Sequence, residues 1–250
     1  MGWVGIAASL VLVISLGYLS YNALNRETKE EPVAEMVKTT DWGQKLNLTL
    51  ADGTRVHLNS GSTIEFPERF EGNTREVKFE GEAFFDVAKD PNKPFIIKSG
   101  EIHTTVLGTS FNISTYTESR QIAVTVASGK VKITSEDSEV FLGPNEQGVF
   151  DKSTKSISKE QTDIAAFLRW KDGILHFDDV TLTEVAKSLE HWYGVTFVFE
   201  NEKAGGCHLT ATYDNEILSA ILESIVHAKK GLQYTYLEDK KILIKGWCTD

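Results

Sequence analysis

Few residues of this sequence have the types and spacings that carry out chemistry. The two cysteines, Cys207 and Cys248, lie far apart, so they form neither a CxxC redox pair nor the thiol set of a zinc knuckle. An exported domain would allow a disulfide between them, whereas two independent buried thiols are expected in a cytosolic domain. A disulfide needs the two Cα atoms within about 7 Å, and the sequence alone leaves both alternatives open.

Acidic and histidine side chains form no catalytic pattern either. The six histidines are scattered singly along the chain, and the GxSxG, HExxH, GxGxxG, Walker and DxDxDG motifs are absent. Glu82 and Asp86 alternate along a predicted strand, where each carboxylate can face solvent or accept hydrogen bonds from a neighbouring turn. Asp178 and Asp179 precede a predicted helix, where acids favour the positive end of the helix dipole. We therefore expect no enzyme, no metal site and no cofactor.

A long uncharged segment at the start of the chain limits what the protein can be. Residues 2–25 carry no charged side chain. As a helix rising about 1.5 Å per residue, the apolar run from Trp3 to Leu24 would be about 33 Å long, which matches a hydrocarbon core of about 30 Å. The sequence therefore predicts a transmembrane anchor over residues 1–25.

A cleavable signal peptide is the alternative interpretation of this segment. It would need a basic start and small residues before the cut, but no Lys or Arg precedes the run, and Tyr21 interrupts the small-residue pattern before Ala23. The nearby basic residues Arg26 and Lys29 stand among glutamates, so the positive-inside rule does not assign an orientation.

The remainder of the chain is long enough for two domains and is acidic. A net charge of -10 argues against binding to nucleic acid or to anionic lipid surfaces, both of which need a basic face. Residues 26–41 are charged and lack a period, which predicts a stalk between the anchor and the first domain.

Short runs of alternating apolar and polar residues predict an all-β domain over residues 42–150. Asp52-Gly53 separates two such runs, and this dipeptide is a strong signal for a hairpin turn. Similar runs continue to Leu142 with turn-forming residues between them, which is typical of a sandwich or a wrapped β-helical stack. Residues 151–171 begin with many Ser, Lys and Thr residues, so we interpret them as a linker that contains a short helix.

The sequence from residue 172 to 250 predicts a small α+β domain in the order βαββαββ. Thr181 and Glu184 form a capping box before an amphipathic helix that ends at Gly194, and Asn215 is expected to cap a second helix. We expect one sheet with both helices on one face.

The last two predicted strands form a hairpin that is a candidate partner-binding surface. As the final element of the sheet, this hairpin would leave backbone groups unpaired at Leu243, and a partner could add a strand there. The residues assigned to this surface are Tyr234, Tyr236, Ile242, Leu243 and Ile244.

The order of several short motifs resembles that of the FecR family of membrane-bound sigma-factor regulators. The resemblance covers roughly residues 42–142, the part from Trp170 onward resembles the family's C-terminal domain, which is related to the short secretin/TonB module, and Trp3–Leu16 resembles its single span. The motifs are Leu48-x-Leu50-x-Asp52-Gly53-Thr54-x-Val56-x-Leu58-Asn59, Gly81-Glu82-Ala83-Phe84-Phe85-x-Val87, Pro94-Phe95, Val106-Leu107-Gly108-Thr109-x-Phe111-Asn112 and Ser128-Gly129-Lys130-Val131.

This resemblance implies a signalling relay across two membranes. A TonB-dependent transporter of the outer membrane, loaded with an iron chelate or a glycan, would contact the periplasmic part of a single-pass inner-membrane protein, and a cytoplasmic extracytoplasmic-function (ECF) sigma factor would be released. Typical members begin with a cytoplasmic segment that binds the sigma factor, but here Met1 stands directly before the predicted span. Either the coding start was placed too far downstream, or the protein lacks a sigma-binding segment of its own.

The resemblance also implies a site of self-cleavage. Some FecR-type regulators are thought to split at a Gly-Thr bond, which corresponds to Gly108-Thr109, where the threonine hydroxyl would attack the preceding carbonyl. The alternative is that Gly108 serves a tight turn and Thr109 starts a strand.

Two other classes of function are retained as alternatives. The first is a membrane-tethered periplasmic binding or scaffold module without a sigma partner. The second is a secreted hydrolase, which would need convergent titratable residues in a pocket.

Overall fold

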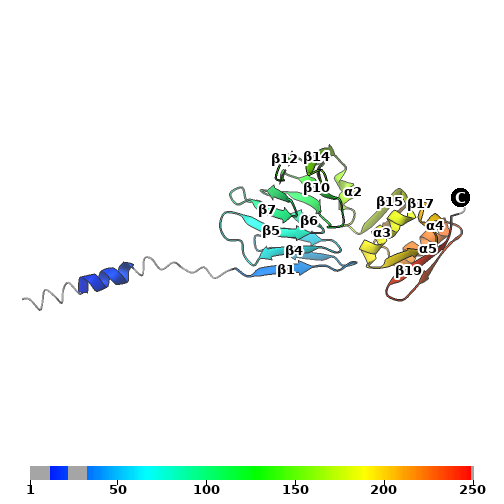
Figure 1. Ribbon diagram of the computed structural model, residues 1–250, viewed down its shortest axis with the longest axis horizontal. Helices are drawn as coiled ribbons and strands as arrows, with labels where there is room; N and C mark the ends of the chain where they lie inside the picture. Colours follow the sequence, from blue (N-terminus) through cyan, green and yellow to red (C-terminus); the bar gives the residue numbers. More distant parts are fainter. Residues whose placement is uncertain (1–11, 22–32, 249–250) are drawn as a thin grey trace, which may run out of the picture. The chain divides into compact units, whose positions relative to one another are not determined.

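The computed structural model describes residues 12–21, which are helical, and residues 33–248 (Figure 1). Among the described residues, no helix combines the length and the apolar character needed to cross a membrane. Much of the predicted anchor over residues 1–25 lies outside the described residues, so the anchor stays a prediction. Ala34–Asp250 form one compact unit, which contains a β-domain and a C-terminal domain.

The β-domain consists of two seven-stranded sheets. Neighbouring strands are antiparallel except for β5 and β7, which are parallel. In spatial order, the first sheet contains β1 (Glu35–Thr39), β4 (Thr63–Pro67), β5 (Arg75–Glu80), β7 (Phe95–Ser99), β8 (Ile102–Val106), β11 (Val131–Thr134) and β12 (Glu139–Leu142). The second contains β14 (Ser156–Gln161), β13 (Glu146–Asp151), β10 (Gln121–Ser128), β9 (Ser110–Ser114), β6 (Glu82–Asp86), β3 (Arg55–Leu58) and β2 (Leu46–Thr49).

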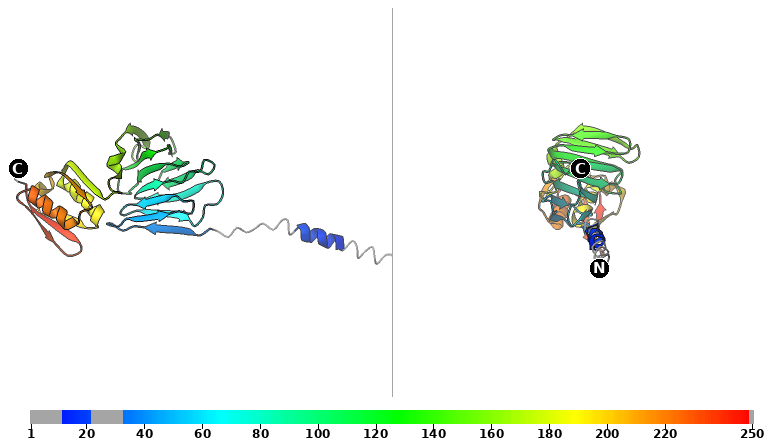
Figure 2. Two further views of the ribbon diagram at one scale, coloured as in Figure 1. Left: turned by 180° about the vertical axis from the view of Figure 1, so that it is seen from behind. Right: turned by 90° about the vertical axis from the view of Figure 1, so that its left-hand side faces the viewer.

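The chain passes back and forth between these sheets and moves steadily from one end of both to the other, as the colour gradient from blue to green shows (Figure 2). Both sheets contribute to one hydrophobic core, in which the rings of Phe85 from β6 and Phe111 from β9 stack at 5.6 Å. The all-β prediction is confirmed. The arrangement combines the two predicted alternatives, because two packed sheets are built by a chain that winds around one core.

Two segments outside the predicted β-domain are strands of it. Glu35–Thr39, predicted as part of the stalk, pairs with β4, and Ser156–Gln161, predicted as linker, pairs with β13. Both are edge strands, and most of their residues are exposed. Their sequences therefore lack the buried alternating residues that identify the inner strands.

The linker that remains contains the expected short helix, α2 (Ile164–Leu168). The side chain of Asp163 caps it by accepting a hydrogen bond from the amide of Ala165 at 3.0 Å. Trp170 follows within the turn that leads to the C-terminal domain.

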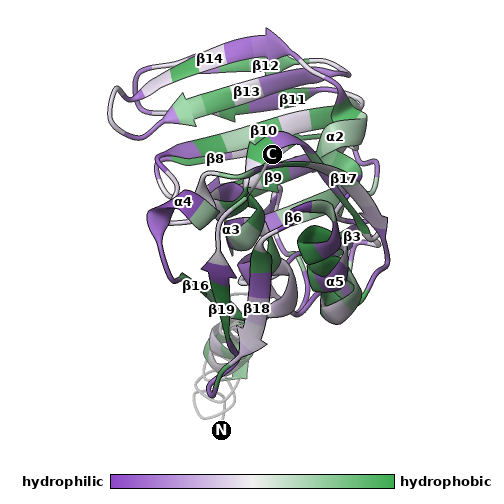
Figure 3. Ribbon diagram, turned by 90° about the vertical axis from the view of Figure 1, so that its right-hand side faces the viewer, coloured by the Kyte–Doolittle hydropathy of each residue, from purple (hydrophilic) through white to green (hydrophobic). Residues whose placement is uncertain are grey.

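The C-terminal domain follows the predicted order, with one extra short helix and two small sheets in place of one. Its elements are β15 (Ile174–Thr181), α3 (Leu182–Tyr193), β16 (Thr196–Phe199), α4 (Glu202–Gly205), β17 (His208–Asp214), α5 (Leu218–Ala228), β18 (Leu232–Tyr236) and β19 (Lys241–Gly246). β15 pairs with β17, and β16, β19 and β18 form a three-stranded sheet in that order. Figure 3 shows α5 as largely hydrophobic, and its buried residues Ile221, Leu222 and Ile225 belong to the core of this domain.

The two main helices start differently. The capping box of α3 is present, because the Thr181 side chain binds the Glu184 amide and the Glu184 side chain binds the Thr181 amide. The prediction that Asn215 caps the second helix is wrong. Ile217 is the N-cap of α5 and makes no side-chain cap, while Asn215 takes a positive φ of 49° in the turn before it.

Candidate functional site

Gly108 and Thr109 lie in the connection between β8 and β9. Gly108 has a φ of 140°, and a Cβ atom at this position would lie 2.7 Å from the Cα of Lys89. Thr109 is only 4% exposed, and its hydroxyl donates a hydrogen bond to the carbonyl of Lys130 at 2.9 Å. A glycine is therefore needed here both for its backbone conformation and for the close approach of Lys89.

Within the described part of the chain, the Thr109 hydroxyl forms hydrogen bonds with main-chain groups only. Besides the Lys130 carbonyl, the hydroxyl accepts a weak hydrogen bond from the Lys130 amide at 3.3 Å. Attack on the Gly108 carbonyl would need a group that takes up the hydroxyl proton, and a carbonyl oxygen does not do this at neutral pH. The geometry fits the tight-turn interpretation, and self-cleavage stays a prediction that requires the hydroxyl to change partner.

The final hairpin does not present Leu243 on an open edge. β19 is the middle strand of its sheet, with Leu243 opposite Val198 of β16 on one side and Thr235 of β18 on the other. The prediction of a free backbone at Leu243 is wrong, because β16 returns to pair with β19 in parallel. Ile242 and Ile244 are buried in the domain core, as expected from their spacing.

The two tyrosines of the predicted surface lie on β18, which is an edge strand of the described sheet. Tyr234 donates a hydrogen bond from its hydroxyl to the Glu223 carboxylate at 2.7 Å, which raises the pKa of Tyr234 to about 12. Tyr236 is 55% exposed, and its ring meets that of Tyr234 edge-on at 5.6 Å. The partner-binding role of these residues stays a prediction, now confined to β18.

Cys207 and Cys248 are joined by a disulfide in this structure, with their Cα atoms 6.0 Å apart. Cys207 lies in the turn before β17 and belongs to the domain core, and Cys248 follows β19 and packs against the same core. The bond ties the end of the described chain to the centre of the C-terminal domain.

A cluster of polar side chains around Glu82 connects the β-domain to Trp170. Glu82 accepts hydrogen bonds from the side-chain amide of Asn59 at 2.7 Å and from that of Asn112 at 3.0 Å. Asn112 in turn accepts a hydrogen bond from the indole nitrogen of Trp170 at 3.1 Å. The segment that leads into the C-terminal domain is thus fixed to β6 and β9 through side chains.

Lys45 also binds the segment around Trp170. Its ammonium group donates to the carbonyl of Trp170 at 2.8 Å and lies 3.4 Å from the ring centroid of Trp192. Desolvation of this group lowers the pKa of Lys45 to about 8, against the opposing effect of the Glu82 charge. The pKa of the Glu82 carboxyl is raised overall, because the effect of burial is the largest. The hydrogen bonds from Asn112 and Asn59 and the charge of Lys45 act in the opposite direction.

Two glycines allow the backbones of the two domains to touch. The amide of Gly43 donates to the carbonyl of His191 at 3.2 Å, and a Cβ at Gly43 would lie 2.7 Å from the carbonyl carbon of Tyr193. A Cβ at Gly194 would overlap the carbonyl oxygen of Trp42, and the rings of Trp42 and His191 are 4.3 Å apart. Little room is left for one domain to move relative to the other at this contact.

A cavity of about 300 Å³ lies beside these contacts. Its walls combine amide, carboxyl and aromatic groups, including Asn59, Glu82, Tyr116, Trp170, His191 and Trp192. Because both Glu82 oxygens already accept hydrogen bonds, the cluster acts first as a joint between the domains, and the cavity beside it has room for a small polar molecule.

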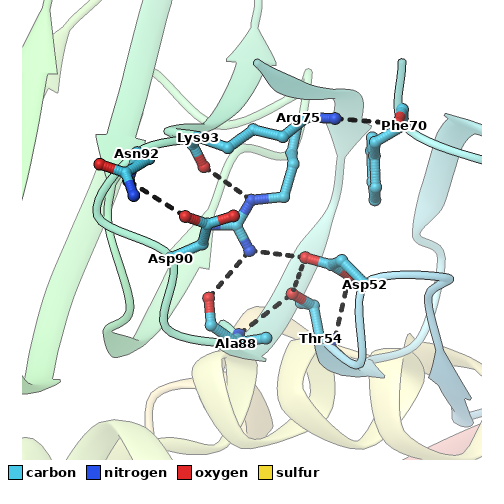
Figure 4. A network of polar contacts seen from close by, with 8 residues as sticks. All are labelled: Asp52, Thr54, Phe70, Arg75, Ala88, Asp90, Asn92 and Lys93. Atoms are coloured by element: carbon cyan, nitrogen blue, oxygen red, sulfur yellow. Dashed lines mark hydrogen bonds and ion pairs between the residues drawn. The ribbon is translucent and has the colours of Figure 1, made fainter. Parts of the chain in front are cut away.

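A second polar network lies within the β-domain around Arg75 (Figure 4). The guanidinium of Arg75 is buried and forms an ion pair with Asp52 at 2.7 Å. Asp52 also accepts a hydrogen bond from the hydroxyl of Thr54 at 2.6 Å. This network fixes the Asp52-Gly53 hairpin turn to β5 and to the loop that contains Ala88, whose carbonyl accepts from Arg75 at 2.8 Å.

Comparison with known proteins shows where this chain belongs. Residues 36–132 match the model of the FecR protein family, and residues 174–244 match that of the FecR C-terminal domain. Two crystal structures, each of a candidate anti-sigma factor from Parabacteroides distasonis ATCC 8503, superpose with a TM-score of 0.71. One is 32% identical in sequence and covers 87% of this chain and 100% of its own; the other is 33% identical and covers 84% and 99%.

No curated protein matches the chain significantly. The likeness to these structures nevertheless extends over both domains at 32–33% sequence identity. The two family models match the β-domain and the C-terminal domain, respectively. The chain belongs to the FecR family.

The sequence left the role of Glu82 open and did not indicate the contacts of the other residues of these two networks. Glu82 was identified as a carboxylate with two alternative environments, and the structure places it among hydrogen-bond donors. Lys45, Trp170 and Arg75 were not identified, because their partners are distant in sequence. The sequence signal for Arg75 is its position, because it shares a strand face with the apolar residues Val77 and Phe79.

Proposed function

We propose that this protein regulates sigma-factor signalling from the inner membrane. In this proposal the two described domains stand in the periplasm, receive a signal from a TonB-dependent transporter of the outer membrane, and control an ECF sigma factor in the cytoplasm. The observation that carries the proposal is the match of both domains, in order, to the FecR family and to structures of candidate anti-sigma factors.

The contacts between the domains support such a role. A relay must pass a change in its partner-binding domain to the rest of the chain, and this requires a joint that is not loose. Lys45, Trp170 and the Gly43–Tyr193 contact connect the domains through hydrogen bonds and close packing. Binding of a partner to the C-terminal domain therefore has a physical route to the β-domain.

A genetic experiment tests the proposal. Deletion of the coding sequence should change transcription of an operon that encodes a TonB-dependent transporter, and expression of the full chain should restore the original level. An unchanged transcriptome in the deletion strain, under conditions that induce such operons in the parent, would contradict it.

The proposed topology has its own test. A phosphatase fused after Asp250 should be active, and a fluorescent protein that folds only in the cytoplasm should stay dark at the same position. The reverse pattern would place the described domains in the cytoplasm.

A periplasmic binding module without a sigma partner is the second candidate function. The cavity of about 300 Å³ beside Glu82 favours it, because amide, carboxyl and aromatic groups together suit small polar ligands. Such a module would leave transcription of transporter operons unchanged after deletion.

A further inference from the structure

Arg75 is enclosed in the β-domain with part of its guanidinium unbound. Nε donates to the carbonyl of Lys93 at 2.9 Å, and Nη1 donates to Asp52 and to the carbonyl of Ala88. Nη2 is buried and has no hydrogen-bond partner among the described residues. Buried donors are rarely left unpaired, so Nη2 is a donor that can bind an acceptor from outside the described chain.

Arg75 is one of the residues that line a cavity of about 340 Å³. Its walls come from the turn between β2 and β3, from the loop after β4 and from the loop after β6. The charged residues in these walls are Arg69, Arg75, Lys89 and Lys93 on the basic side and Asp52 and Asp90 on the acidic side. The cavity wall is therefore net basic in a chain whose net charge is -10.

Most of these charged groups already have partners (Figure 4). Arg69 forms an ion pair with Glu71 at 2.7 Å, and the ammonium of Lys93 donates to the carbonyl of Phe70 at 2.9 Å. Asp90 accepts a hydrogen bond from the Asn92 amide at 3.0 Å. Lys89 is exposed, and its side chain has no partner among the described residues.

We propose that this cavity binds a small organic anion whose carboxylate or phosphate group is held by Arg75 Nη2 and Lys89. Water would satisfy only Nη2, whereas an anion would also pair with the Lys89 ammonium, which has no partner among the described residues. Because arginine binds oxyanions through its N–H groups and carries its charge at any physiological pH, it suits this role. The cavity is larger than a bare phosphate ion, so the ligand is expected to have a body that lies against Phe70.

Binding requires a small movement of the wall. Nη2 is covered in the present structure, and the Asp90 carboxylate is the wall group that an incoming anion would repel. Among the described residues, the Asp90 carboxylate accepts a hydrogen bond only from the main-chain amide of Asn92, while the Asp90 amide itself donates to the carbonyl of Leu107 at 2.9 Å. We therefore expect Asp90 to oppose binding and Lys89 to favour it.

Titration calorimetry of the purified full-length chain tests the proposal, with inorganic phosphate and succinate as separate probes at constant ionic strength. At least one of them should bind saturably with one site per chain. Lys89→Gln should weaken this binding by about fivefold or more, because it removes a nearby positive charge, and Asp90→Asn should strengthen it. Lys38→Gln removes an exposed lysine of β1, which does not line the cavity, and should leave the affinity unchanged.

The outcomes distinguish a phosphorylated ligand from a carboxylic acid, and both from a cavity that binds no anion. Saturable binding of phosphate alone supports a phosphorylated ligand, and saturable binding of succinate alone supports a carboxylic acid. No saturable binding of either probe would show that the cavity holds water only and would overturn the proposal. Equal affinities in Lys89→Gln, Asp90→Asn and Lys38→Gln would also overturn it, because binding would then lie elsewhere.

Discussion

The indole nitrogen of Trp170 donates a hydrogen bond to the side-chain oxygen of Asn112 at 3.1 Å, across 58 residues of sequence. Asn112 uses its amide group at the same time to bind Glu82. A single asparagine thus links the half-buried carboxyl group of Glu82 in the β-domain to the segment that leads into the C-terminal domain. Substitution of this asparagine or of its partners should therefore loosen the connection between the domains.

Trp170→Phe should weaken the joint without removing its packing. The substitution leaves the Asn112 oxygen without its donor, so the free energy of unfolding should fall by about 1 kcal/mol in urea denaturation. Limited proteolysis between residues 163 and 173 should also become faster, because the segment is held less firmly. Trp247→Phe, at a residue that is 58% exposed, is the matched control and should change neither measurement.

Gly194→Ala should disturb the contact between the domains. Gly194 and Gly72 have nearly equal φ values, 65° and 61°, so alanine suffers a similar backbone strain of about 1 kcal/mol at both. Only at Gly194 does the new Cβ meet the carbonyl oxygen of Trp42, whereas at Gly72 no atom of the described residues lies within 4 Å of it.

The excess destabilisation of Gly194→Ala over Gly72→Ala, measured by thermal or urea unfolding, therefore reports the close approach of the backbones. We expect this excess to be positive and of the order of the overpacking penalty, about 1–3 kcal/mol. Equal losses in the two variants would mean that the domains do not touch at Trp42 in solution.

Several parts of the fold were predictable because their signals are local. The Asp52-Gly53 hairpin is confirmed, since β2 and β3 pair with Leu48 opposite Val56, and Gly53 takes the expected positive φ of 86°. The capping box at Thr181 is equally local. Turn and cap residues interact with neighbours within a few positions, so their roles can be predicted from the local sequence.

Pairings between distant segments were not predictable in the same way. β16 and β19 are parallel neighbours separated by two strands and two helices, and no residue of Thr196–Phe199 indicates this partner. The contact between the two domains was equally unpredictable, because Lys45, Asn112 and Trp170 interact only once the chain has folded. Neither the pairing of β16 with β19 nor the contact of Lys45 with Trp170 and Trp192 produces a periodic pattern in the sequence.

The disulfide should stabilise the C-terminal domain. Cross-linking residues 41 positions apart restricts the unfolded chain, and a loop of this length typically adds about 2–4 kcal/mol. Cys248→Ser should lower the free energy of unfolding by this amount, and reduction of the wild-type chain should do the same. Recovery of two alkylated thiols from denatured, unreduced protein purified from an exported source would contradict the disulfide.

Lys45 should make stability depend on alkaline pH. Its pKa in the folded chain is lowered from 10.5 to about 8, so between these values the unfolded chain binds more protons at this residue than the folded chain does. The free energy of unfolding contributed by Lys45 should therefore rise as the pH increases from about 8 to 10.5 and stay level below that window.

Comparison with Lys45→Met isolates this contribution from other titrating groups. The wild-type chain should gain stability relative to Lys45→Met as the pH rises through the window, as measured by urea unfolding at several pH values. A difference between the two proteins that stays constant with pH would show that contact with Trp170 and Trp192 does not lower the pKa of the ammonium group.

Self-cleavage at Gly108-Thr109 can be separated from a purely structural role by three threonine variants. If the hydroxyl attacks the preceding carbonyl, the purified wild-type chain should give two fragments that meet at this bond, Thr109→Ser should still split, and Thr109→Ala should remain intact. Thr109→Val keeps the β-branched shape that suits the start of a strand but lacks the hydroxyl, so it should fold and remain intact.

Because the hydroxyl now donates to the Lys130 carbonyl, cleavage must compete with that hydrogen bond and is expected to be slow. A wild-type chain that stays whole through long incubation, with Thr109→Ala and Thr109→Val destabilised by the loss of the hydrogen bond to Lys130, would establish the tight-turn role instead.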